Sequence, residues 1–270
     1  MIWKYLLIVM ALCVSAWGQP AELTRERAME LWPVYVATQA APNAPGAIVE
    51  RLNMYRAAAG LGPVAVDAAL NPGSQQCARV LALNPTWVIS HTLPRPLKGW
   101  TAAASTAAKN GCIDRYDDGA RAVADFMRDW GLTSLNKYVG HRRWLMHPGL
   151  QTVGVGAVAS SLGNPAAVCI YVRTPMGAST QAVAWPPAGD VPIGWVPERW
   201  SYSAPGSDLS AAAVWMDGRR VSVARQAGTS PPGVIVWQPT LPFNVESRHV
   251  VRIEGLPGGR VEYEVRRFRP

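Results

Sequence analysis

The spacing of apolar residues changes part-way along this chain, and that change restricts the fold. In AIVERLNMYRAAAG, the residues Ile48, Leu52, Tyr55 and Ala59 recur with helical spacing. Beyond residue 150 the apolar residues form two short runs, TVGVGAV and AAVCIYV, which are separated by the turn-like SSLGNP and predict a strand hairpin. Helices followed by an antiparallel sheet indicate an α+β fold for the first half of the chain.

A further amphipathic helix is predicted in DDGARAVADFMRDWG, and Gly131 is expected to end it. Its apolar face recurs at intervals of three and four residues and comprises Val123, Phe126, Met127 and Trp130.

The last part of the chain has no helical period. Proline and glycine crowd residues 174–192, so we expect a first domain over residues 46–177 and a second over residues 178–270. In the second, Asp217-Gly218 separates two strand-like runs, which is typical of a type I′ hairpin. Short strands with turns between them predict a small all-β sandwich of the immunoglobulin-like kind, with about seven strands. Its core is expected to hold five tryptophans, namely Trp185, Trp195, Trp200, Trp215 and Trp237.

Residues 1–18 are typical of a secretory signal peptide. An early lysine precedes an apolar run from Tyr5 to Val14, and Ala16 and Gly18 have the spacing of a cleavage site. A membrane-spanning helix needs about 20 apolar residues, roughly twice this run, so no transmembrane segment is expected after cleavage. We therefore expect a secreted protein, extracellular or periplasmic, in which residues 19–45 form an N-terminal extension.

The net charge of +8 comes mostly from arginines that are scattered over the whole length. The sequence has no run of five or six like charges and no nucleic-acid-binding motif, so no nucleic-acid partner is expected. The charge does allow a weak attraction to acidic polymers of a cell envelope.

Removal of the leader leaves Cys77, Cys112 and Cys169, an odd number for an oxidising compartment. We expect a structural disulfide between Cys77 and Cys112, with Cys169 as a buried thiol in an apolar strand. The alternative is that all three are reduced. No C-x-x-C spacing indicates a redox pair.

Two of the four histidines stand in loop-like segments. His91 precedes a proline-broken loop, and His141 is expected in a loop that enters a strand. Two imidazoles from separate loops can bind zinc, with a carboxylate or water completing the tetrahedron. The alternative is that each histidine is neutral and hydrogen-bonded in the interior, and this describes His147 and His249 better.

Six motifs of the first domain follow one another in a characteristic order. They are IVERLNMYRAAAGLGPVAVDAAL followed by SH, then AVADFMRDW, VGHRRW, VGVGAV and VCIYV. Over residues 46–174 this set resembles the CAP superfamily of secreted proteins, or SCP domain, which includes cysteine-rich secretory proteins, antigen 5 and plant pathogenesis-related proteins. The GHRRW motif resembles a bacterial branch. The resemblance implies an α-β-α sandwich with a large groove, often centred on two histidines and two glutamates.

The resemblance assigns groove positions to particular residues. His91 and His141 match the two histidines. Asp129 stands where the helix glutamate is expected, and its shorter side chain is expected to reach the pair only through water. The second glutamate has no counterpart, because its region offers Ser105 or Thr106. Zinc is therefore an open cofactor assignment, weaker than for a full set of four ligands.

Arg142 and Arg143 follow His141 and are expected to alternate faces. One of them would then point into the groove and bind a carboxylate or sugar acid bidentately, so both are candidate ligand-binding residues. The alternative is a structural salt bridge to Asp125 or Asp129. Trp144 is expected to pack beneath the turn.

The resemblance implies a non-catalytic binding protein whose groove takes a lipid, peptide or glycan, or a component of the cell envelope. The alternative is a hydrolase of envelope polymers or peptides, with His91, His141 and Asp129 as candidate catalytic residues or with zinc activating water. Ser90 and Ser105 are the hydroxyl groups considered as nucleophiles. A third hypothesis makes both histidines structural, so that replacing either one destabilises the fold.

Overall fold

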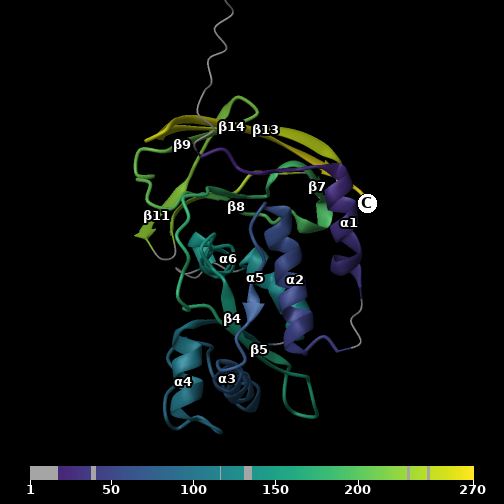
Figure 1. The fold of residues 1–270 in the computed structure, drawn as a ribbon, viewed down its shortest axis with the longest axis vertical. Coiled ribbons are helices and arrows are strands. Elements are labelled where there is room, and N and C mark those ends of the chain that lie inside the picture. Colours follow the sequence, from purple (N-terminus) through teal and green to yellow (C-terminus); the bar gives the residue numbers. More distant parts are fainter. Residues whose placement is uncertain (1–17, 38–40, 116, 131–135, 230–231, 242–243) are drawn as a thin grey trace, which may run out of the picture.

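A computed structural model describes residues 18–37, 41–115, 117–130, 136–229, 232–241 and 244–270 (Figure 1). The lower half of the figure combines helices with a four-stranded sheet, and the upper half consists of two further sheets. This arrangement confirms the predicted α+β fold with an all-β part at the C-terminal end. None of the helices in these ranges combines the length and apolar character that crossing a bilayer requires.

Helices dominate the described chain up to residue 145, and strands dominate it afterwards. The helices are α1 Arg25–Val36, α2 Pro45–Ala58, α3 Asn71–Leu83, α4 Ala102–Lys109, α5 Gly119–Arg128 and α6 Gly140–Leu145, with short 3-10 turns η1 Asn136–Tyr138 and η2 Ile193–Trp195. The strands are β1 Glu22–Leu23, β2 Ala65–Val66, β3 Gly111–Arg115, β4 Thr152–Val158, β5 Ala167–Tyr171, β6 Val183–Trp185, β7 Ala188–Pro192, β8 Trp200–Ser203, β9 Ala213–Met216, β10 Arg219–Val221, β11 Ala224–Thr229, β12 Pro232–Trp237, β13 Ser247–Leu256 and β14 Gly259–Phe268.

The sheet of the lower half has the strand order β2-β4-β5-β3 and carries helices on both faces. β3 and β5 pair antiparallel, with Cys112 opposite Ile170 and Ile113 opposite Cys169. Successive strand residues point to opposite faces. Ile170 therefore joins the core shared with α2 and α5, whereas Cys169 joins the core shared with α3 and α4.

The same alternation contradicts the predicted disulfide between Cys77 and Cys112. The three cysteines of the described ranges are all free and buried. Cys112 lies on the α2 and α5 side of the sheet, while Cys77 of α3 packs on the other side and shares a hydrogen bond with Cys169. The prediction was wrong because it considered the elements that carry the cysteines and not the sheet face to which each one points.

The helix α5 ends earlier than predicted. Asp118 caps its first turn by accepting a backbone N–H, and Arg128 is its last helical residue. Asp129 then adopts a left-handed backbone conformation, with φ of 56°. Trp130 was expected on the buried face but is 54% exposed, because the chain leaves the helix before reaching it. The expected terminator, Gly131, lies outside the described residues.

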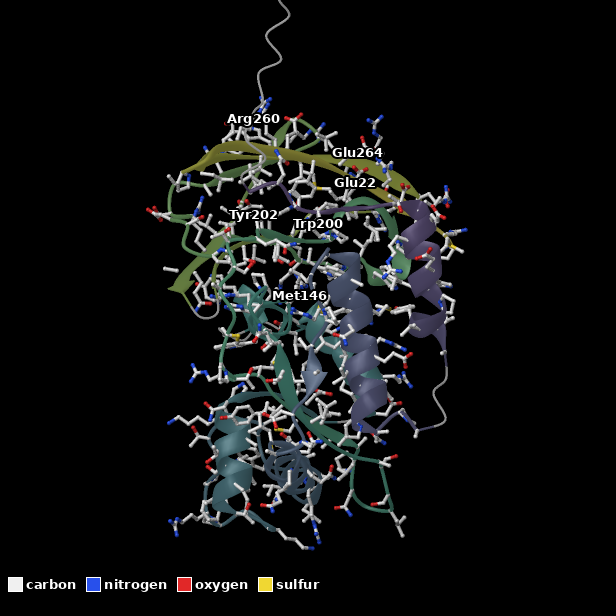
Figure 2. All side chains as sticks on the ribbon, in the orientation of Figure 1. Glu22, Met146, Trp200, Tyr202, Arg260 and Glu264 are labelled. Carbon is white, nitrogen blue, oxygen red and sulfur yellow. The ribbon has the colours of Figure 1, made fainter. Side chains whose placement is uncertain are left out.

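The upper half is a sandwich of two sheets with the orders β1-β7-β14-β13-β9-β10 and β11-β12-β8-β6. Figure 2 places Trp200 and Tyr202 beneath the larger sheet and Arg260 and Glu264 toward its outer side. Nine strands, β6 to β14, fall within the described part of residues 183–268, more than the seven expected. Asp217 and Gly218 join β9 to β10 with φ of 50° and 78°, which confirms the predicted type I′ turn.

The tryptophans of the sandwich have two kinds of surroundings. Trp185, Trp195, Trp200 and Trp237 are buried, which confirms a core role for these four. Trp215 is only partly buried, and the guanidinium groups of two arginines lie 5.8 and 5.0 Å from the centre of its ring.

The N-terminal segment connects the two halves. β1 pairs in parallel with β7 of the sandwich, and α1 lies beside α2. Tyr35 of α1 donates a hydrogen bond to the Gly194 carbonyl at 2.9 Å, and Tyr55 of α2 meets Trp185 edge-on at 5.5 Å. One cluster of buried side chains therefore runs from the helices into the sandwich. The predicted leader lies outside the described residues, apart from Gly18.

Candidate functional site

Asp129 and His141 are brought together by the ends of two helices. Asp129 follows the last residue of α5, and His141 is the second residue of α6. The distance from Asp129 Oδ1 to His141 Nδ1 is 2.9 Å, and Asp129 Oδ2 accepts the backbone N–H of His141 at 3.0 Å. The expectation that Asp129 reaches the pair only through water was therefore wrong. The chain turns directly after α5 and places this carboxylate beside α6, with its side chain only 1% exposed.

Hydrogen-bond partners define the tautomer of both groove histidines. A carboxylate oxygen only accepts, so Nδ1 of His141 carries a proton, and in the neutral ring Nε2 keeps its lone pair. Nδ1 of His91 lies 2.8 Å from the carbonyl oxygen of Ala108, which assigns the same tautomer. Burial is the main cause that lowers the pKa of His91, and the neighbouring His141 and Arg173 lower it further. His91 is therefore neutral at pH 7.

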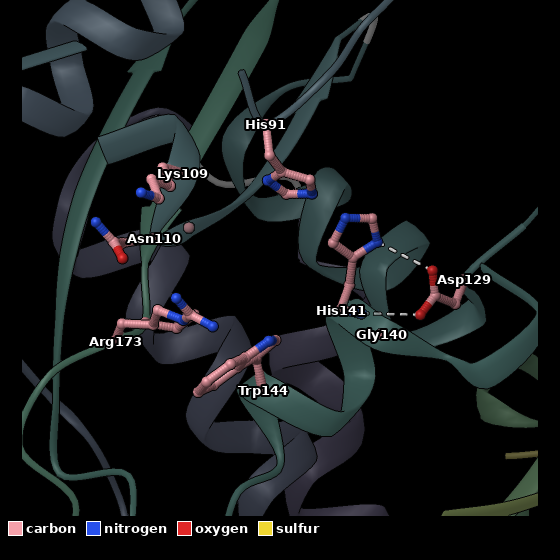
Figure 3. A pocket seen from close by; sticks show the side chains of 10 residues that line it. His91, Lys109, Asn110, Asp129, Gly140, His141, Trp144 and Arg173 are labelled. Carbon is pink, nitrogen blue, oxygen red and sulfur yellow. Dashed lines mark hydrogen bonds and ion pairs between the residues drawn. The ribbon is translucent and has the colours of Figure 1, made fainter. Parts of the chain in front are cut away.

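Both rings line a cavity of about 170 Å³, and they lie close to each other (Figure 3). Their ring centres are 6.2 Å apart, and Phe126 packs against His141 with ring centres 4.9 Å apart. The cavity is lined by His91, Lys109, Asn110, Gly111, Asp129, Gly140, His141, Trp144, Val172 and Arg173. The structure thus unites His91, His141 and Asp129 in one site, as the sequence had suggested.

The arginines after His141 do not serve the role predicted for them. His141 lies in a helix and not in a loop entering a strand, so the residues after it turn by about 100° each instead of alternating faces. Arg142 is buried and donates to the carbonyl groups of Met127 and Arg199, at 2.6 and 2.9 Å. Arg143 is buried and donates to Gln226. Neither belongs to the described residues that line the cavity.

Trp144 lines the cavity because it lies three residues after His141, on the same side of α6. It is also partly buried and packs against the core, as expected for this residue.

The sequence reasoning missed two cations of the cavity. Lys109 is the last residue of α4, and Arg173 follows β5 by two residues. The Arg173 guanidinium lies 5.2 Å over the ring of Trp144. The sequence contained a signal for both cations, because each one follows a run of mostly apolar residues and so marks the end of a buried element.

An acidic hollow adjoins the cavity and shares Asp129 and His141 with it. Burial raises the pKa of Asp114 to about 6. Burial, reinforced by the neighbouring Asp117, raises the pKa of Asp125 to about 7. At neutral pH this hollow therefore carries less negative charge than its number of carboxyl groups suggests.

Comparison with known families agrees with this geometry. Residues 49–171 match the model of the CAP family, described as the Cysteine-rich secretory protein family. This part of the chain is a CAP domain. The match confirms the resemblance that the six ordered motifs indicated over residues 46–174. No curated protein was found to match the chain.

The CAP domain of this chain has an incomplete set of zinc ligands. The Nε2 atoms of His91 and His141 are both available, but the two oxygens of Asp129 already accept hydrogen bonds from His141. The described ranges contain no group of three or more His, Cys, Asp or Glu residues that could hold a metal ion. Protein zinc sites use at least three such ligands. The residues present therefore do not fit a zinc centre, and no step proposed below depends on one.

The other two histidines lie outside the CAP cavity and have their own partners. Nδ1 of His147 accepts a backbone N–H at 3.0 Å, and this side chain is buried. Nδ1 of His249 lies 2.8 Å from Asp217 Oδ2, and Nε2 lies 2.9 Å from Ser247 Oγ. Both are hydrogen-bonded histidines, as predicted.

Proposed function

We propose that this chain is a secreted binding protein whose CAP domain holds a small polar ligand, a glycan or a peptide, against the rings of His91 and His141. The arrangement of the two imidazoles carries this proposal. Each ring is fixed by a hydrogen bond at Nδ1, and in its neutral form it keeps the Nε2 lone pair. Two acceptors oriented in this way suit the hydroxyl or amide donors of a ligand. Three side chains of the lining, Lys109, Asn110 and Arg173, offer charged and amide groups to which a glycan or a peptide can bind.

The surroundings of the cavity favour binding over nucleophilic catalysis. Ser90 and Ser105, the two hydroxyl groups considered as nucleophiles, are not among the described residues that line it. A covalent mechanism needs a nucleophile within hydrogen-bond reach of its base.

A second candidate function is hydrolysis by an activated water, and the Asp129–His141 pair favours it. A carboxylate bonded to Nδ1 holds an imidazole with Nε2 ready to accept a proton, as in known general-base pairs. In this reaction Nε2 of His141 would take a proton from water while the oxygen bonds to the carbonyl carbon of a peptide link, and would return that proton to the leaving amine as the C–N bond breaks. The same residues serve both functions, so turnover separates the two.

Secretion is part of the proposal, and it rests on the leader-like residues 1–18. The mass of the exported protein would show whether the chain is cut after Gly18.

The test uses the mature protein and insoluble peptidoglycan, an envelope polymer that contains both glycan and peptide. Sedimentation measures bound protein, and chromatography of the supernatant measures released fragments. We expect binding that is lost in His91→Ala and in His141→Ala, is kept in the distant control Arg260→Ala, and occurs without fragment release. Release that disappears only in His141→Ala would establish the hydrolase instead. Binding that is unchanged in both histidine variants would refute a role for this groove.

A further inference from the structure

The cavity has a positively charged side. Figure 3 shows Lys109, Asn110 and Arg173 together across the cavity from the Asp129–His141 pair, with Trp144 between the two groups. Lys109 ends α4 and Arg173 follows β5, so the fold brings these cations together from separate elements. Both side chains are exposed, so a ligand can reach them without displacing the core.

Carboxylates of the described residues do not neutralise this side. Neither Lys109 nor Arg173 takes part in an ion pair within 4.0 Å in the described part of the chain. Asp129 is the carboxylate among the described residues that line the cavity; it lies on the opposite side and is bonded to His141 and Asn136. The cations therefore remain available to an anionic group from outside.

The position of Arg173 suits recognition of a planar anion. Its guanidinium lies over the face of Trp144, at 5.2 Å from the ring centre. Stacking of this kind limits the motion of the guanidinium and leaves its N–H edge free to form paired hydrogen bonds with a carboxylate. The nearby charge of Lys109 adds an attraction without a fixed geometry.

The two sides of the cavity are suited to bind different groups of one ligand. The side of His91 and His141 presents two acceptors, which repel an anion and bind a hydroxyl or N–H donor. The side of Lys109 and Arg173 presents two cationic donors beside the neutral amide of Asn110. A neutral sugar can donate hydrogen bonds to the histidines but offers no anion to the cations. A simple carboxylate can pair with the cations but offers no donor to the histidines.

We infer that the groove takes an acidic sugar, whose hydroxyl or amide groups face His91 and His141 while its carboxylate faces Arg173 and Lys109. This inference rests on the proposed binding function and names its ligand class. The sequence had suggested Arg142 and Arg143 for anion recognition, and this role is now assigned to Arg173 and Lys109.

A matched pair of probes tests the inference. N-acetylmuramic acid differs from N-acetylglucosamine by a lactyl ether that carries a carboxylate. In calorimetric titrations of the mature protein at low salt, we expect the acidic sugar to bind about ten-fold or more tightly, as for a charge-assisted pair. Arg173→Gln and Lys109→Gln should each reduce this preference, whereas the control Arg260→Gln, at the start of β14, should keep it. Added salt should weaken the preference, because these charges are exposed.

Three outcomes would overturn the inference. Equal affinities for the two sugars, lost in His91→Ala, would leave the binding groove standing and remove its acidic preference. An equal loss in Arg260→Gln and Arg173→Gln would mean that overall positive charge attracts the anion. Failure of both sugars to bind, while peptidoglycan still binds in a His91-dependent manner, would refute the acidic sugar and leave the proposed function intact.

Discussion

Asp129 holds His141 by two hydrogen bonds, one to the ring at Nδ1 and one to the backbone N–H, at 2.9 and 3.0 Å. One nearly fully buried carboxylate therefore fixes both the start of α6 and the orientation of the imidazole. The left-handed turn at Asp129 makes this possible, because it ends α5 beside α6.

Asp129→Asn should reverse the tautomer of His141. The amide oxygen can still accept the backbone N–H, but the amide nitrogen then donates toward Nδ1, so the ring proton moves to Nε2. We expect imidazole ¹⁵N chemical shifts to report this change for His141 and not for His249 in the same sample. Stability should fall by about 1–3 kcal/mol, since a charged acceptor is lost. An unchanged His141 spectrum would contradict this role of Asp129.

Arg142 and Arg173 should respond differently to the same substitution. Arg142→Gln leaves the buried carbonyl groups of Met127 and Arg199 without their donor, so we expect a loss of about 3 kcal/mol or more in unfolding free energy. Arg173→Gln removes an exposed charge and should change stability by no more than about 0.5 kcal/mol. Denaturant titration of both variants measures the difference. Equal effects would mean that Arg173 is also structural.

The raised pKa of Asp125 makes stability depend on pH. Its folded pKa of about 7 lies above the ordinary value of 3.8, so the folded state keeps a proton that the unfolded state releases. This contribution is present at low pH and is lost as pH rises through about 7. From about pH 5 to about pH 8, the unfolding free energy of the wild type should therefore fall by roughly 1–2 kcal/mol more than that of Asp125→Asn. This figure allows for the half-exposed side chain of Asp125. Urea titrations at both pH values measure this, with Asp67→Asn as the control. If the unfolding free energies of wild type and Asp125→Asn changed in parallel with pH, the raised pKa of Asp125 would be refuted.

The thiols of the mature chain should be free but unreactive. Cys77, Cys112 and Cys169 are buried, and burial raises the pKa of the Cys112 and Cys169 thiols. A thiol reagent such as DTNB should label none of the three in the native protein and all of them after unfolding without reductant. Labelling of a single cysteine after unfolding would reveal a disulfide.

Zinc should bind weakly to the two groove histidines. With two imidazoles and no third protein ligand in the described ranges, we expect a dissociation constant weaker than about 1 μM by calorimetry. The heat of this weak zinc binding should disappear in His91→Ala and in His141→Ala. Tighter binding that needs both histidines would show that a further ligand completes the site.

Local pattern was enough to predict much of the framework. Helical spacing located α2, the Asp217-Gly218 pair located a hairpin, and four of the five tryptophans expected in the core are buried. The ordered motifs also selected His91, His141 and Asp129 as one group. These features depend on residues close in sequence or on a resemblance between whole motifs.

Tertiary packing decided which side chains meet in the groove. The sequence determined that arginines follow His141, but a helix there turned them into the core, and Arg173 arrived from the end of β5. It likewise determined where the cysteines lie, while the pairing of β3 with β5 placed Cys112 and Cys169 on opposite faces of one sheet. The physical reason is the same in both cases. The direction of a side chain depends on its local backbone, but its partners depend on elements that pack against it from distant parts of the chain.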